Sequence, residues 1–221
     1  MSINSLPPLL RRALAEFIGT YVLVLAGCGA IIVNATTGAL GHSGVAASFG
    51  LAVGVMIAAT GHISSAHFNP AVTLAFAIIR RFAWRDVPVY ILAQVSAAVA
   101  AAATLRLLFG DIAMLGATIP AGSVTQSFVL EVLLTAALMF VIVAVATDAK
   151  AAGNLAPLAI GAVVALGALW GGPISGASMN PARSFGPALI SGVWTEHWLY
   201  WVAPCIGATI GAWAYEIVRP S

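Results

Sequence analysis

Six apolar stretches, each near the length of a membrane-spanning helix, constrain the fold of this chain more than any other feature. A helix needs about 20 mostly apolar residues to cross the hydrocarbon core of a bilayer. The stretches that approach this length are Ala13–Val33, Val45–Ile63, Val87–Leu105, Ser127–Thr147, Leu155–Trp170 and Trp198–Tyr215. Only 7% of the 221 residues are charged, which is too few to cover a water-exposed surface. The sequence therefore predicts an all-α membrane protein with six transmembrane helices.

Two further apolar runs, Pro70–Ile79 and Pro181–Val193, are too short to span. Each begins with proline, which suits the first turn of a helix because its missing N–H would be unpaired there. Each follows small and polar residues, 61–68 and 171–178, which we interpret as irregular backbone. Such backbone is stable at membrane depth only where it is buried in protein or lines a water-filled cavity. We therefore expect two re-entrant half-helices beside a pore.

The chain also repeats itself. Glu16 precedes Asn69 by 53 positions, and Glu131 precedes Asn180 by 49. Each half then holds three spans, an odd number, so the two repeats should have opposite orientations in the bilayer. We expect one transmembrane channel domain over residues 1–221, with repeat one at about 10–108 and repeat two at about 124–218.

The basic residues predict the orientation. Six spans place most of them on the side of the two termini: Arg11, Arg12, Arg80, Arg81, Arg85, Lys150 and Arg219. The other side holds Arg106 and Arg183. By the positive-inside rule both termini are cytoplasmic. The first apolar run is too long for a signal peptide, so we expect a multi-pass protein of the plasma (inner) membrane.

Two Asn-Pro-Ala tripeptides, Asn69-Pro70-Ala71 and Asn180-Pro181-Ala182, open the two short runs. The N-terminus of a half-helix carries unpaired N–H groups and a partial positive charge. If both termini meet at the midplane, the Asn side chains can donate to passing water oxygens, break the water wire and help repel protons and cations. A simpler interpretation is that each Asn only caps its half-helix. We expect both roles.

The sequence around these tripeptides resembles the aquaporin, or major intrinsic protein, family. The matching segments are Gly61-His-Ile-Ser-Ser-Ala-His-Phe-Asn-Pro-Ala-Val-Thr73 and Gly172-Pro-Ile-Ser-Gly-Ala-Ser-Met-Asn-Pro-Ala-Arg-Ser-Phe-Gly-Pro-Ala188, and the resemblance extends over nearly the whole chain. It implies a passive channel without cofactor, assembled as a homotetramer with one pore in each subunit. The second segment looks closest to the nodulin-26-like branch and its bacterial relatives, which is associated with glycerol, urea and neutral metalloid acids. Other positions match water-selective members: Ser184, Ala188, Tyr200 and Trp201.

The family's aromatic/arginine selectivity filter falls, by register from the two Asn residues, on Phe49, Ala168, Ala177 and Arg183. Strict water channels usually have His where this chain has Ala168, so the resemblance implies a wider and less polar filter. Without the register, Phe49 would be read as ordinary packing, and Arg183 could be a snorkelling surface side chain.

Glu16 and Glu131 are acidic residues deep in predicted spans. A carboxylate inside a membrane is a candidate for a proton relay. It can equally accept hydrogen bonds from the exposed backbone of the adjacent irregular segment, because buried charges need partners. We favour this bracing role, which fits one Glu per repeat. His62 and His67 flank the first half-helix and should brace its loop, since no third metal ligand lies nearby.

These features predict a passive channel for water or small uncharged solutes that excludes protons and ions, with the lipid bilayer as its solvent. A proton-coupled secondary transporter with inverted repeats is the main alternative, and a non-conducting structural member is a third. No pattern suggests an enzyme, a cofactor or a metal site, and a net charge of +2 is too small to suggest nucleic acid.

Overall fold

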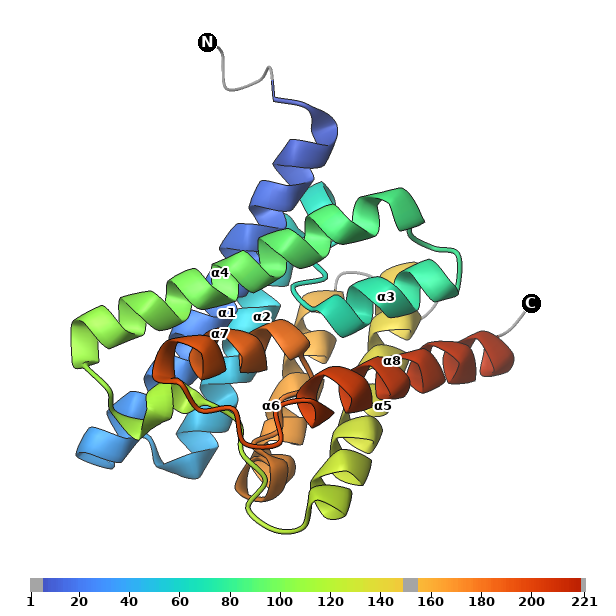
Figure 1. Cartoon of the computed structure of the whole chain (residues 1–221). Helices are drawn as coiled ribbons and strands as arrows, with labels where there is room; N and C mark the ends of the chain where they lie inside the picture. The colour runs from blue at the N-terminus through green and yellow to red at the C-terminus, as the bar shows by residue number, and fades with distance from the viewer. Residues whose placement is uncertain (1–5, 149–154, 220–221) are drawn as a thin grey trace.

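The computed structural model describes residues 6–148 and 155–219. This part folds into eight α-helices: α1 (Pro8–Thr37), α2 (Gly41–Ser64), α3 (Pro70–Ile78), α4 (Val87–Phe109), α5 (Val124–Thr147), α6 (Ala156–Ser175), α7 (Pro181–Ser191) and α8 (Leu199–Val218). Six of them are long and apolar enough to cross a membrane, which confirms the predicted fold class. α3 and α7 are the two short helices among the long ones (Figure 1). Lys150, one of the predicted cytoplasmic basic residues, lies outside the described residues.

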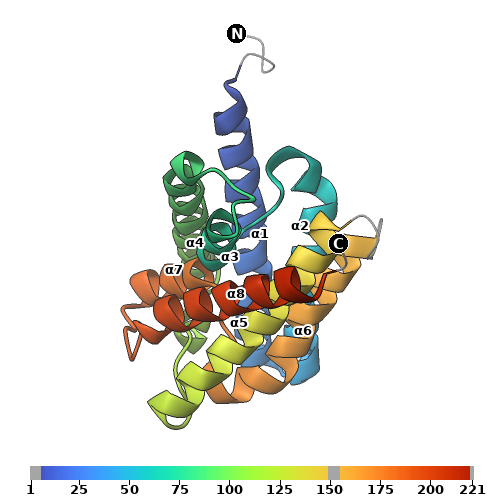
Figure 2. The ribbon, with the colours of Figure 1, turned by 90° about the vertical axis from the view of Figure 1, so that its right-hand side faces the viewer.

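Each half-helix packs against the last long helix of the other half of the chain. α3 contacts α8, and α7 contacts α4. Figure 2 shows α7 below α4 at the left and α3 above α8. The two halves are therefore interlocked.

Glycines allow the closest helix crossings. A Cβ atom on Gly50 would overlap the carbonyl oxygen of Gly161, so α2 and α6 cross backbone to backbone. A Cβ on Gly211 would overlap the carbonyl of Ala136 where α8 crosses α5. In lipid, helices associate through such close packing because no hydrophobic force drives them together.

The end of the bundle where α1 begins and α8 ends, here called the terminal end, is tied together by ion pairs. Arg12 Nη1 lies 3.0 Å from Asp86 Oδ2, just before α4. Arg81, in the turn after α3, lies 2.6 Å from Glu216 Oε1 near the end of α8. The starts of α1 and α4 and the end of α8 thus meet at one face of the bundle.

The irregular segments are shorter than the sequence predicted. α2 stays helical through Ser64 and α6 through Ser175, so only residues 65–69 and 176–180 depart from helix. The prediction for α6 was wrong because Pro173, which removes one backbone donor, sits inside the helix. That donor would have bonded to the carbonyl of Leu169, which instead lies 2.6 Å from His42 Nε2. Since a carbonyl only accepts, Nε2 carries the proton and replaces the missing N–H.

Both irregular segments contain backbone in the left-handed region. In the first, Ser65, Ala66 and Phe68 have φ values of 69°, 49° and 51°. In the second, the equivalent positions are Gly176, Ala177 and Met179, with φ values of 84°, 41° and 52°. Such conformations cost a residue other than glycine about 1–3 kcal/mol and persist only where surrounding contacts enforce them.

Candidate functional site

Asn69 and Asn180 cap the two half-helices. Asn69 Oδ1 accepts a hydrogen bond from the Ala71 N–H at 2.9 Å, and Asn180 Oδ1 accepts one from the Ala182 N–H at 3.0 Å. Both Asn residues have extended backbone, as N-caps do. The first turns that they cap are buried and contain Pro70-Ala71 and Pro181-Ala182.

The same two Asn side chains link the halves of the chain. Asn69 Nδ2 donates to the carbonyl of Met179 at 2.7 Å, and Asn180 Nδ2 donates to the carbonyl of Phe68 at 2.8 Å. An amide nitrogen has two N–H donors, so one remains on each side chain. Both Asn residues line a central cavity. The junction therefore offers two donors to a molecule in that cavity.

Glu16 binds the backbone of the first irregular segment and does not line the central cavity. Its carboxylate accepts hydrogen bonds from the backbone N–H groups of His67 (2.9 Å) and Phe68 (2.7 Å). It also accepts from Ser64 Oγ (2.7 Å) and Gln94 Nε2 (2.9 Å). Glu16 is completely buried, so its charge is compensated by four donors rather than by water.

Glu131 does the same for the second segment. It accepts from the backbone N–H groups of Ser178 and Met179, both at 2.8 Å, and from Ser175 Oγ at 2.7 Å. It too is completely buried. Two carboxylates at equivalent places thus hold two left-handed segments.

His67 packs inside the first segment. Its Nδ1 lies 3.1 Å from Thr73 Oγ1, and its ring lies 4.9 Å from the rings of both Phe76 and Phe82. Its ring also lies 5.2 Å from the ring of Tyr90, so aromatic side chains enclose the imidazole. His62, by contrast, is exposed in the last turn of α2, and its predicted bracing role stays a prediction.

The four predicted filter residues lie together at a neck between two cavities. The central cavity has a volume of about 240 Å³, and the outer one, on the side away from the terminal end, about 480 Å³. Phe49, Ala168, Ala177 and Arg183 line both of them. A molecule that moves from one cavity to the other must pass these four side chains.

Arg183 is held at the neck by two neutral groups. Its guanidinium carbon lies 4.8 Å from the centre of the Phe49 ring, and its Nη1 donates to the carbonyl of Gly116 at 2.7 Å. The side chain is almost completely buried in protein. Because neither partner carries a formal charge, the positive charge of Arg183 remains at the neck.

Sequence reasoning missed the support for this arginine. Gly116 ends a short 3₁₀ turn, Ala113–Gly116, and has a φ of 75°. A Cβ on Gly116 would press against Cys28, which lies behind it on α1. Nearby, Thr118 Oγ1 donates to Ser184 Oγ at 2.7 Å. A backbone carbonyl carries no sequence signal, so the role of Gly116 could not be predicted.

The bonds of two tyrosines to the irregular segments were also missed, although the repeat contains a signal for them. The Tyr90 hydroxyl donates to the carbonyl of Ser64 at 2.8 Å, and the Tyr200 hydroxyl donates to that of Ser175 at 2.6 Å. Tyr90 follows Asn69 by 21 positions, and Tyr200 follows Asn180 by 20. Aligning the two repeats on their Asn residues brings these tyrosines within one position of each other.

Comparison with known proteins agrees with this geometry. Aquaporin NIP1-1 of Zea mays is 55% identical to this chain, covering 96% of it and 76% of the relative. Aquaporin NIP3-1 of Arabidopsis thaliana is 50% identical, covering 95% of this chain and 68% of the relative. The X-ray structure of the aquaglyceroporin from Plasmodium falciparum superposes with a TM-score of 0.85 at 31% identity, covering 95% of this chain and 96% of that one. The family profile described as "Major intrinsic protein" matches residues 3–215, and the chain belongs to that family.

Proposed function

We propose that this chain is a passive membrane channel for water and small uncharged solutes. The observation that carries the proposal is the neck lined by Phe49, Ala168, Ala177 and Arg183, which joins an outer cavity to a central one. The central cavity reaches the two Asn residues at the junction of the half-helices. This arrangement forms a path with fixed polar groups and apolar walls.

The polar groups on this path are donors, which favours neutral molecules with acceptor oxygens. Arg183 and the free amide N–H groups of Asn69 and Asn180 can each bond to a water or hydroxyl oxygen. A water molecule that bonds to both Asn residues is oriented by them and cannot continue a proton-conducting chain. The Arg183 charge lies in a poorly solvated neck, so its repulsion of cations is weakly screened.

The burial and contacts of the acidic and histidine side chains near the path disfavour a proton-coupled mechanism. Glu16 and Glu131 are completely buried and occupied by backbone and side-chain donors, and neither lines the two cavities. His67 lines the central cavity, but its Nδ1 lies 3.1 Å from Thr73 Oγ1 and its ring packs against Phe76 and Phe82. These contacts favour a bracing role for all three groups over a proton relay.

The size of the neck residues indicates which solutes are small enough to pass. Ala168 and Ala177 contribute only methyl groups opposite Phe49 and Arg183, which leaves room for molecules larger than water. The similarity to NIP-type aquaporins and to an aquaglyceroporin points the same way. We therefore assign glycerol, urea and neutral metalloid acids, beside water, as the solute class.

We further propose a homotetramer in the plasma (inner) membrane with cytoplasmic termini. Large apolar side chains such as Leu51, Leu92 and Leu158 are exposed on the outside of the spans, where lipid or a neighbouring subunit would cover them. Basic residues gather at the terminal end. Each subunit would form one channel domain from two repeats, at about 10–108 and 124–218.

Stopped-flow light scattering on proteoliposomes tests the function. Water, glycerol, urea and a neutral metalloid acid such as boric acid should each cross faster than through bare lipid, without saturation and without response to a proton gradient. A pH-sensitive dye in the same vesicles should report no added proton leak. A proton or K⁺ current comparable to the solute flux, or saturable transport driven by a proton gradient, would contradict a passive channel.

A further inference from the structure

We propose that Arg12 and Asp86 are positioning residues for permeation, which act through Tyr90 and the Ser64 carbonyl on the pore-lining backbone of residues 65–68. The proposal rests on the channel function above but not on the identity of the solute. It assigns a role to a charged network at the terminal end that the filter and the Asn junction do not use.

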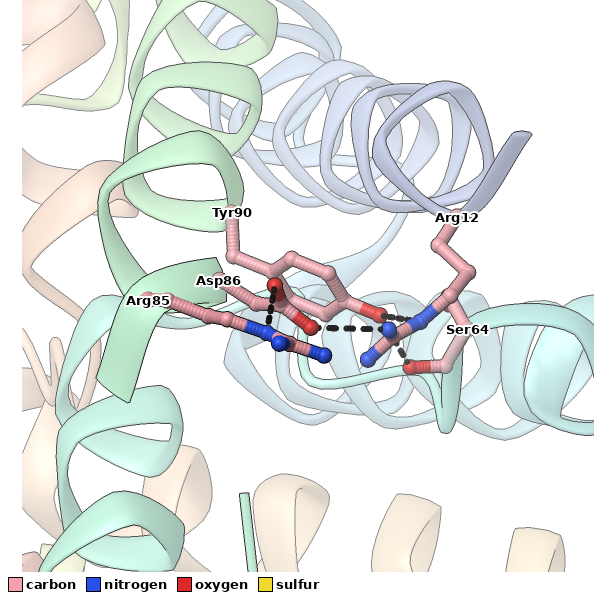
Figure 3. A network of polar contacts seen from close by, with 5 residues as sticks. All are labelled: Arg12, Ser64, Arg85, Asp86 and Tyr90. Carbon is pink, nitrogen blue, oxygen red and sulfur yellow. Dashed lines mark hydrogen bonds and ion pairs between the residues drawn. The ribbon is translucent and has the colours of Figure 1, made fainter. Parts of the chain in front are cut away.

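The network runs from α1 to the pore wall in three contacts (Figure 3). Arg12 Nη1 donates to Asp86 Oδ2 at 3.0 Å, and Arg12 Nε donates to the Tyr90 hydroxyl at 2.8 Å. The Tyr90 hydroxyl in turn donates to the carbonyl of Ser64 at 2.8 Å. The Arg12 guanidinium also lies 5.1 Å from the centre of the Tyr90 ring. One arginine thus fixes both the hydroxyl and the ring of the tyrosine.

Arg85 contributes little to this network, although Figure 3 draws it beside Asp86. Its Nε lies 3.7 Å from Asp86 Oδ1, and its side chain is 88% exposed. An exposed pair of this kind is worth little because water screens it and the long side chain stays mobile. The Asp86 side chain is only 12% exposed, so the Arg12 pair is the better protected of the two.

In the described residues of the second repeat, the tyrosine is present but no ion pair lies behind it. Tyr200 donates to the carbonyl of Ser175 as Tyr90 does to that of Ser64. Arg12 lies four positions before Glu16, and the residue four positions before Glu131 is Ser127. The Ser127 hydroxyl makes only a long bond, 3.4 Å, to the carbonyl of Ile174. The two pore-lining segments are therefore supported differently.

A difference in backbone strain accounts for this asymmetry. The C-cap of α2 is Ser65, with a φ of 69°, whereas the C-cap of α6 is Gly176, with a φ of 84°. Glycine adopts this conformation without steric cost, and serine does not. The first segment therefore needs more restraint than the second, and the Arg12–Asp86 pair supplies it through Tyr90.

The restrained segment forms part of the conducting path. Ser65, Ala66, His67 and Phe68 all line the central cavity. If Ser64 and Ser65 relax towards an unstrained conformation, the groups that face a passing solute move. Phe49 lies 15 positions before Ser64 on α2, and Arg183 lies on α7. The neck is therefore away from the segment that relaxes, and its selectivity should stay the same.

Water permeability of the reconstituted full-length protein, normalised to the amount of assembled channel, tests the proposal. Arg12→Gln should lower it about three- to ten-fold, and the glycerol-to-water ratio should remain that of the wild type. Arg81→Gln is the matched control, because it removes an ion pair at the same end with similar side-chain exposure, 26% and 18% against 31% and 12%. This control should keep wild-type permeability.

The decisive comparison uses Ser65→Gly. If Arg12 restrains a strained Ser65, Arg12→Gln should cost much less permeability in the Ser65→Gly background than in the wild type. Tyr90→Phe, which keeps the ring and the ion pair, should reproduce the loss and provides the test if Arg12→Gln does not assemble. The melting temperature of each variant shows whether it is still folded. A variant that loses permeability but keeps the wild-type melting temperature has lost the positioning of the segment and not its fold.

Different failures have different meanings. If the Arg12→Gln and Tyr90→Phe proteins have the same high water permeability as the wild type, the positioning role is overturned and the channel function is not. An equal loss in both Ser65 backgrounds, or an equal loss in Arg81→Gln, would overturn it as well. Wild-type vesicles no faster than bare lipid would overturn the channel function and this proposal with it.

Discussion

Arg183 keeps its full charge at the neck because a ring face and a backbone carbonyl hold it in place. A carboxylate partner in the same place would neutralise the field that a passing cation meets. The ring of Phe49 fixes the guanidinium plane, and the Gly116 carbonyl occupies one of its donors. In the proposed channel, the remaining donors would bond to solutes, and Ala168 and Ala177 would set the room that those solutes have.

Ala168→His should shift the channel towards strict water selectivity. The imidazole adds bulk and a polar group to a neck that now holds two methyl groups, and a three-carbon polyol loses more hydration there than the ring can replace. We expect a fall in glycerol and urea flux of more than about ten-fold, with water flux kept within a few-fold. Stopped-flow measurement of all three solutes checks this. Unchanged fluxes would mean that position 168 does not line the path.

Arg183→Val should weaken cation exclusion while the fold persists. The substitution removes the charge and leaves the Gly116 carbonyl without its donor, so the neck becomes attractive to cations. Proton and K⁺ leak should rise above that of the wild type in the same vesicles, and solute selectivity should relax. Wild-type leak and selectivity in correctly assembled protein would contradict the placement of Arg183 in the filter.

Sequence register predicted the four neck residues as a group, and the structure brings them together. The resemblance to the aquaporin family supplied the four filter positions, and the register from the two Asn residues located them in this chain. The network behind them was not predictable, since the partner of Arg183 is the carbonyl of Gly116, a loop residue. The ion pair of Arg12 with Asp86 joins residues 74 positions apart, and no local pattern connects them.

At the scale of helices, the ends were the least predictable feature. The spans were found by hydropathy, but α1 begins at Pro8 and ends at Thr37, beyond the apolar stretch at both ends. α6 continues through Pro173, where the sequence suggested irregular backbone. Tertiary contacts decide such ends, and a single sequence does not contain them. The His42–Leu169 bond illustrates the point, because it satisfies a carbonyl 127 positions away.

The proline in α6 makes His42 a testable support for that helix. His42→Ala should lower the free energy of unfolding by about 1 kcal/mol, because the Leu169 carbonyl loses its donor. In the Pro173→Ala background the new N–H can bond to Leu169, so the same substitution should cost close to nothing. Thermal or denaturant unfolding of the four variants in detergent gives this double-mutant cycle. Equal costs in both backgrounds would show that His42 does not compensate for the proline.

On the scale of the whole molecule, the position of the thiols predicts resistance to mercurials. Cys28 is completely buried behind Gly116, Cys205 lies partly exposed on α8, and neither lines the two cavities. Short treatment with HgCl₂ should therefore leave water flux unchanged. Ala177→Cys, which places a thiol at the neck, should become sensitive and serves as the positive control. Block of the wild type that disappears in Cys28→Ser or Cys205→Ser would contradict the prediction.

The reciprocal bonds of Asn69 and Asn180 have a consequence for synthesis. Each bond joins residues 110 or 112 positions apart, so neither acceptor carbonyl meets its donor until the second half of the chain exists. At about 5–20 residues per second, the first half waits roughly 5 to 20 seconds with an incomplete junction. During that interval its first three spans and their half-helix need other shelter for their polar backbone, whether water, lipid headgroups or the insertion machinery. The junction between the half-helices can therefore form only after the second half of the chain has been made, and a chain truncated after α4 lacks both of these bonds.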